Sequence, residues 1–174
     1  YLAFFISGVS AILYEVIWIR LLGLSFGGVT MVIAVVTSVF LLGLAIGAGV
    51  GGRIADTLVK TGQLKGLGLW YLGIELTVAM LGLVNLKIFA DFRLSGDDYR
   101  LPVAGALLLI QTIAAGATYP VMYKMLLLLG KSWNVTGLIA FLNTLGGAIG
   151  AFLAAFFLLS NFGIHQTVFF AVGL

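Results

Sequence analysis

Long apolar stretches follow one another through almost the whole chain, and this feature restricts the fold more than any other. We place them at about residues 1–24, 29–52, 66–89, 101–129, 135–160 and 164–174, the last one incomplete. A helix needs about 20 mostly apolar residues to cross the hydrocarbon core of a bilayer. The alternation of polar and apolar residues that barrel strands show is absent from these stretches. The sequence therefore predicts an all-α membrane protein, a bundle of six transmembrane helices in a single domain over residues 1–174.

The composition agrees with a bilayer environment. Hydrophobic residues make up 62% of the 174 residues and charged residues only 9%, whereas a soluble domain carries about 25% charged residues. The chain contains no cysteine, which excludes disulfides, thiolate catalysis, iron–sulfur clusters and zinc ribbons. His165 is its single histidine, so we expect no metal or haem site and no cofactor.

The connections between the stretches carry most of the charge and give an orientation. Basic residues are retained on the cytoplasmic side of a membrane. Placing the second-to-third and fourth-to-fifth connections there puts five basic residues inside and four outside. The five are Arg53, Lys60, Lys65, Lys124 and Lys131, and the four are Arg20, Lys87, Arg93 and Arg100. This bias favours a cytoplasmic N-terminus. Because the chain begins and ends within apolar runs, we also expect it to be a piece of a longer protein.

Two ridges of glycine repeat at intervals of four residues. Gly43, Gly47 and Gly51 lie in the second stretch, and Gly146 and Gly150 lie in the fifth. Small residues at this spacing let a neighbouring helix approach the backbone closely, so we expect both ridges to be helix-packing surfaces. Two equivalent ridges three stretches apart are also what a duplicated three-helix unit would produce. Chance spacing in glycine-rich helices is the alternative.

Two glutamates interrupt the apolar stretches, and a charged side chain at membrane depth costs about 2.5–3.5 kcal/mol on insertion scales. Glu15 would bind a cationic amine or carry a coupled proton, with Tyr14 and Trp18 offering aromatic faces to the cation. Glu75 lies near the middle of the third stretch, and together the two acids would make a site selective for positive charge. The alternative for each is a structural role, in which the side chain holds neighbouring helices together.

Further polar residues lie in the fourth and fifth stretches. Gln111 and Asn143 complete the expected substrate-binding set, although an interhelical hydrogen bond is the other interpretation of Asn143. Pro120 cannot donate a backbone hydrogen bond and clashes with the preceding turn, so we expect the fourth helix to bend near Gly116.

The end of the second stretch, "GGRIADTLVKTGQLK", resembles the cytoplasmic loop motif of the major facilitator superfamily. Gly52 and Asp56 match the glycine and the aspartate of that motif, but Thr57 stands where a basic residue is usual. Arg53 and Asp56 would form a charge pair at a gating loop that latches neighbouring helices in one state. Six helices correspond to half of such a transporter.

Five segments in order resemble the membrane domain attached to spermidine-synthase-like proteins of bacteria. They are "SGVSAILYEVIWIRLLGLSFG", "FLLGLAIGAGVGGRIAD", "YLGIEL", "AGATYPVM" and "FLNTLGGAIGAFLAAFFLLSNFGIHQT". The resemblance implies a bundle similar to half of a major facilitator transporter, with a 3+3 repeat, in the bacterial inner membrane. It also implies a soluble aminopropyltransferase-like domain as a partner, following the membrane part in many members.

Two functions stay open at this point. The chain would handle or translocate a small cationic solute such as a polyamine, with two copies pairing as a homodimer. Otherwise it would be a membrane anchor or assembly module for a soluble aminopropyltransferase domain, or a subunit of a larger membrane complex, without transport. The sequence contains no catalytic motif, because its glycine runs lie inside hydrophobic helices rather than after a strand. Its basic residues are scattered at the ends of the apolar stretches, so the expected partner is the lipid bilayer and not nucleic acid.

Overall fold

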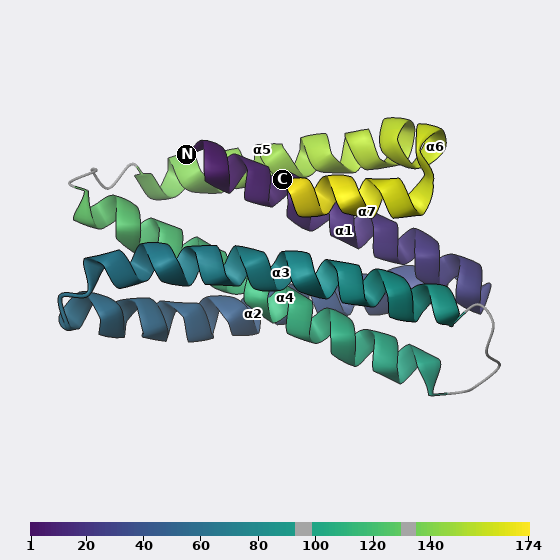
Figure 1. The fold of residues 1–174 in the computed structure, drawn as a ribbon, viewed down its shortest axis with the longest axis horizontal. Helices are drawn as coiled ribbons and strands as arrows, with labels where there is room; N and C mark the ends of the chain where they lie inside the picture. Colours follow the sequence, from purple (N-terminus) through teal and green to yellow (C-terminus); the bar gives the residue numbers. More distant parts are fainter. Residues whose placement is uncertain (93–98, 130–134) are drawn as a thin grey trace.

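The computed structural model describes residues 1–92, 99–129 and 135–174, and all regular structure in these ranges is helical. The elements are α1 (Leu2–Phe26), α2 (Val29–Lys60), α3 (Leu64–Asp91), α4 (Arg100–Leu128) and α5 (Val135–Leu153), then a π-helical turn η1 (Ala154–Leu158), α6 (Leu159–Asn161) and α7 (Gly163–Gly173). Successive long helices run in opposite directions (Figure 1). The predicted all-α class is therefore confirmed for the described residues. Arg93 and Lys131, which contribute to the orientation estimate, lie outside them.

Five helices of the described residues are long and apolar enough to cross a membrane. They are Leu2–Phe26, Val29–Lys60, Lys65–Asp91, Arg100–Leu128 and Thr136–Asn161. The sixth predicted stretch forms α7, which has 11 residues. At 1.5 Å per residue α7 is about 16 Å long, roughly half the thickness of the hydrocarbon core.

Helix α2 extends beyond the predicted boundary at residue 52 and ends at Lys60. Its 32 residues span about 48 Å, more than the ~30 Å of the hydrocarbon core. The apolar run marks where the bilayer ends, but a helix continues into water as long as its residues favour helix. Arg53, Asp56 and Lys60 all lie within this last part of α2.

Glycines allow the tight reversals between helices. Gly27 follows α1 with a φ of +68° and donates its N–H to the carbonyl oxygen of Gly23 at 3.0 Å. Gly163, with a φ of +76°, stands where α6 gives way to α7. A residue with a Cβ is strained in this left-handed region, and glycine is not. These turns bring consecutive helices into antiparallel contact.

The glycine ridge of α2 lies against α4. A Cβ atom at Gly43 would overlap the Thr112 hydroxyl, and one at Gly47 would overlap the carbonyl of Ile113. A Cβ at Gly51 would lie 2.7 Å from the Cα of Ala117. Helix α4 is continuous through Pro120 over this interface. Backbones this close require hydrogen in place of a side chain, so the ridge sets the distance between the two helices.

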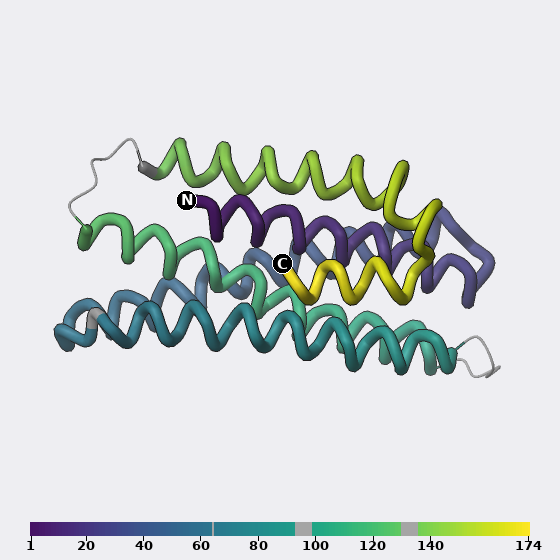
Figure 2. Tube along the Cα trace, turned by 45° about the horizontal axis from the view of Figure 1, so that its top comes forward, coloured from purple at the N-terminus to yellow at the C-terminus, as the bar shows by residue number. Residues whose placement is uncertain are grey.

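The second ridge brings α5 against α1. A Cβ at Gly146 would overlap the carbonyl oxygen of Phe5, and one at Gly150 would lie 2.5 Å from the carbonyl oxygen of Val9. Figure 2 shows α5 running alongside α1, with α7 on the other side of α1. Helix α7 contacts both α1 and α3, and Ser10 of α1 donates a hydrogen bond to the carbonyl oxygen of Ala171 at 2.9 Å.

Candidate functional site

A cavity with a volume of about 770 Å³ lies between α1, α2, α4 and α5. Small residues of the two glycine-rich helix pairs leave this space open, and apolar side chains such as Phe4, Phe40 and Leu44 form much of its wall. Its polar lining consists of Ser7, Glu15, Thr37, Thr118, Tyr119, Asn143 and Thr144. Glu15 is the one charged residue among the described residues that line it.

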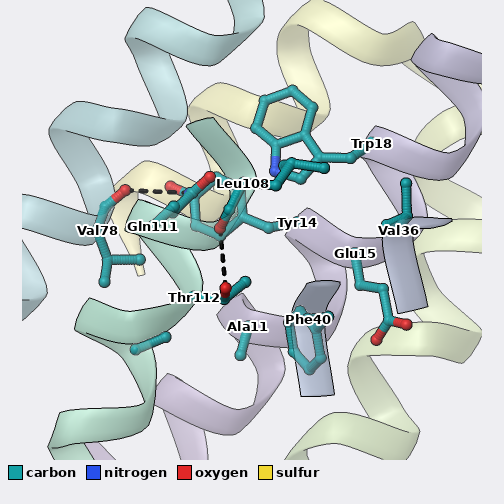
Figure 3. A pocket seen from close by; sticks show the side chains of 11 residues that line it. Ala11, Tyr14, Glu15, Trp18, Val36, Phe40, Val78, Leu108, Gln111 and Thr112 are labelled. Carbon is teal, nitrogen blue, oxygen red and sulfur yellow. Dashed lines mark hydrogen bonds between the residues drawn. The ribbon is translucent and has the colours of Figure 1, made fainter. Parts of the chain in front are cut away.

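Glu15 lies near the middle of α1 and is half-buried. Its carboxylate oxygen Oε1 accepts a hydrogen bond from the Thr37 hydroxyl of α2 at 3.1 Å. Within the described residues, no Lys or Arg forms an ion pair with it. Figure 3 shows the carboxylate directed away from Tyr14 and Trp18. Thr37 was not singled out from the sequence, since a threonine in an apolar helix gives little indication of its partner.

Asn143 is the second expected site residue that lines this cavity. Its side-chain oxygen Oδ1 and its own carbonyl lie close to Gly8 of α1, where an added Cβ would be 2.9 Å from Oδ1. The absence of a side chain at Gly8 therefore allows Asn143 of α5 to pack directly against α1. The structure thus brings Glu15 and Asn143, from helices far apart in the sequence, to one cavity.

Tyr14 and Trp18 are turned toward α3 and do not line the large cavity. Their rings stack at a centroid distance of 5.9 Å, and the rings of Trp18 and Phe89 form a T-shaped pair with a centroid distance of 5.3 Å. Both side chains are almost completely buried. The structure therefore separates these two aromatic faces from the Glu15 carboxylate, although all three residues border a small void.

Gln111 is buried in a hydrogen-bonded pair with Asn85 of α3. The Asn85 amide nitrogen donates to Gln111 Oε1 at 2.8 Å, and the Gln111 amide nitrogen donates to the carbonyl oxygen of Val78 at 3.3 Å. Gln111 borders the small void, which has a volume of about 20 Å³ (Figure 3). That is room for about one water molecule. Asn85 was not predicted from the sequence, although a single amide within the apolar segment "LGLVNLKIF" could have indicated a buried hydrogen bond.

Glu75 lines a different cavity, of about 370 Å³, between α1, α3 and α7. The two glutamates were expected to form one site, but the structure places them in separate cavities. Glu15 faces α2, whereas Tyr14, the residue before it, lies with Glu75 in the other cavity. Consecutive residues of a helix point about 100° apart, so α1 presents Glu15 to one cavity and Tyr14 to the other, while Ser7 borders both.

Asp56 at the end of α2 pairs with α4 rather than with its neighbour Arg53. Its Oδ1 lies 2.6 Å from Lys124 Nζ. Arg53 instead accepts a hydrogen bond at its carbonyl oxygen from the Thr57 hydroxyl, at 2.9 Å. The structure therefore joins α2 to α4 through Asp56 and Lys124, and it does not show the expected pair between Arg53 and Asp56.

No group of three or more His, Cys, Asp or Glu that could hold a metal ion occurs in the described part of the chain. Comparisons with protein-family models, with curated proteins and with solved structures find no match. The chemistry of the two cavities is therefore the basis for inferring a function.

Proposed function

We propose that this chain is a membrane module that binds and translocates a small cationic solute, such as a polyamine, in the cavity that contains Glu15. One observation carries the proposal. The described lining of a cavity of about 770 Å³ contains one carboxylate and no Lys or Arg. A carboxylate in largely apolar surroundings attracts a cation and repels an anion, because little solvent screens its charge.

The size and lining of the cavity suit a polyamine. Small-molecule sites typically enclose about 300–1,000 Å³ and combine apolar walls with a few polar groups. Phe4, Phe40 and Leu44 would contact the methylene segments of the solute. Hydroxyl and amide groups, among them that of Asn143, would accept hydrogen bonds from the ammonium groups. Thr37 occupies one oxygen of Glu15 with a single bond, which leaves acceptor capacity for the ligand.

The arrangement of helices supports a transporter-like unit. The first, second, fourth and fifth helices surround the cavity, and the matched pairs α2–α4 and α1–α5 each pack through a glycine ridge. This pairing is consistent with a 3+3 repeat of the kind found in half of a major facilitator transporter. We propose that two copies face one another across this cavity in a bacterial inner membrane, with a cytoplasmic N-terminus. The resemblance to spermidine-synthase-like membrane domains suggests the polyamine.

The test is uptake of labelled spermidine into proteoliposomes. Glu15→Gln keeps the shape of the side chain and removes its charge, and we expect it to lower uptake at subsaturating spermidine at least tenfold. Asp91→Asn is the matched control, because it removes an exposed carboxylate at the end of α3, outside the cavity. We expect this control to match the wild type. Uptake no greater than in protein-free liposomes would refute transport and favour the anchor or assembly role.

A further inference from the structure

The cavity that contains Glu75 has features of a second binding site. It encloses about 370 Å³ between α1, α3 and α7. Tyr14, Tyr71 and Glu75 contribute its larger polar groups, and Ser7 and Ser10 add two hydroxyls. None of the described residues that line it is a Lys or an Arg. Glu75 and Glu15 border different cavities, and Ser7 is the one described residue that lines both.

The buried hydroxyl of Tyr14 has no hydrogen-bond partner among the described residues. Tyr14 is only 4% exposed, and Glu75 is its acidic neighbour. The Tyr71 hydroxyl, on a side chain that is 8% exposed, interacts with Glu75 and Ser7 beside the same cavity. Buried polar groups in proteins are almost always hydrogen-bonded, so the unpartnered Tyr14 hydroxyl near a carboxylate indicates a place for a ligand.

The backbone of α3 makes room for this arrangement. A Cβ at Gly82 would lie 2.5 Å from Cε1 and 2.7 Å from the hydroxyl of Tyr14. Glycine at this position therefore leaves room for the ring edge and the hydroxyl of Tyr14 beside α3.

We propose that this cavity binds the ammonium group of a single-tailed amphiphilic amine. One carboxylate balances one positive charge, and the two phenols offer hydrogen-bonding oxygens and aromatic faces to the ammonium group. Leu72 and Leu76 border the same cavity and are 58% and 65% exposed, which provides an apolar path for a hydrocarbon tail. A phospholipid headgroup does not fit, because Glu75 lies near the middle of α3 and headgroups stay at the membrane surface.

The experiment is binding of labelled dodecylamine to the purified protein in lipid nanodiscs, with empty nanodiscs subtracted. We expect saturable binding by the wild type that Glu75→Gln weakens about 10- to 100-fold. Tyr71→Phe keeps the ring and removes the hydroxyl, and we expect it to weaken binding about 3- to 10-fold. Asp91→Asn, an exposed acid outside the cavity, serves as the control. The helical content and the melting temperature of each variant establish that it is folded.

The competitors decide the chemistry of the ligand. Dodecanol has the tail without the ammonium group, and spermidine has ammonium groups without the tail, so neither should displace dodecylamine. Displacement by dodecanol, unchanged binding in Glu75→Gln, or no saturable binding by the wild type would each overturn the proposal. Loss of dodecylamine binding in Glu15→Gln would also overturn it, by assigning the amine to the other cavity. Failure of spermidine uptake alone would count against the function proposed for the Glu15 cavity and not against amine binding in the Glu75 cavity.

Discussion

The glycine ridge of α2 predicts a large difference in stability between two substitutions only two residues apart. In Gly47→Ala, the new Cβ would lie 2.9 Å from the carbonyl carbon of Ile113 and 3.0 Å from the amide nitrogen of Ala117. Carbon atoms pack best at about 3.5–4.0 Å. The carbonyl oxygen of Ile113 would be closer still, so helix α2 would have to withdraw from α4 by more than roughly 0.6–1.1 Å, which weakens contacts along the whole interface.

Gly49→Ala supplies the matched control. Gly49 is exposed on the same helix, and no described atom lies within 4 Å of a Cβ built there. Both substitutions gain the same helix propensity, about 0.8–1.0 kcal/mol. The difference between the two variants therefore reports the clash at Gly47 alone. Overpacking of this kind typically costs about 1–3 kcal/mol, so we expect Gly47→Ala to be less stable than Gly49→Ala by that amount.

The assay is the free energy of unfolding in dodecylmaltoside micelles, from an SDS titration followed by far-ultraviolet circular dichroism. Equal free energies for the two variants, within about 0.5 kcal/mol, would refute the packing of α2 on α4 described above.

Two other predictions use the same titration. Asn85→Leu leaves the Gln111 amide buried without its partner, so we expect a loss of about 1–3 kcal/mol. The double variant with Gln111→Leu as well should recover most of that loss, and an additive second loss would contradict a paired role. Gly27→Ala forces a side chain into the left-handed region at a φ of +68°, at a cost of about 1–2 kcal/mol. Its neighbour Gly28 has a φ of −100°, so Gly28→Ala should cost clearly less, and equal losses would count against this account of the turn.

The sequence predicts the helices well, because a backbone that crosses a bilayer in an apolar segment must satisfy its own hydrogen bonds, and a helix does so. It predicts their ends less well. Arg53, Asp56 and Lys60 mark the edge of the bilayer in the sequence, yet α2 continues through all three. Lys124, the partner of Asp56, is far away in the sequence, so the pairing depends on how α2 and α4 pack.

The sites depend on features that a sequence does not display. Glu15 and Glu75 both interrupt apolar runs, but the cavity that each one lines is set by the rotation of its helix against its neighbours. The side chain of Tyr14 faces α3, whereas that of Glu15, the next residue, faces α2. Asn85 gains its significance from a pair with Gln111 that forms only when α3 meets α4.

The most direct test of the central claim is equilibrium binding of spermidine to the protein in nanodiscs, compared between the wild type and Glu15→Gln. The account predicts saturable binding by the wild type that weakens at least tenfold in Glu15→Gln, because the variant cavity has lost the one carboxylate of its described lining. Binding of equal strength in the two proteins would contradict it, since the cavity would then hold the cation without the charge on which the proposal rests.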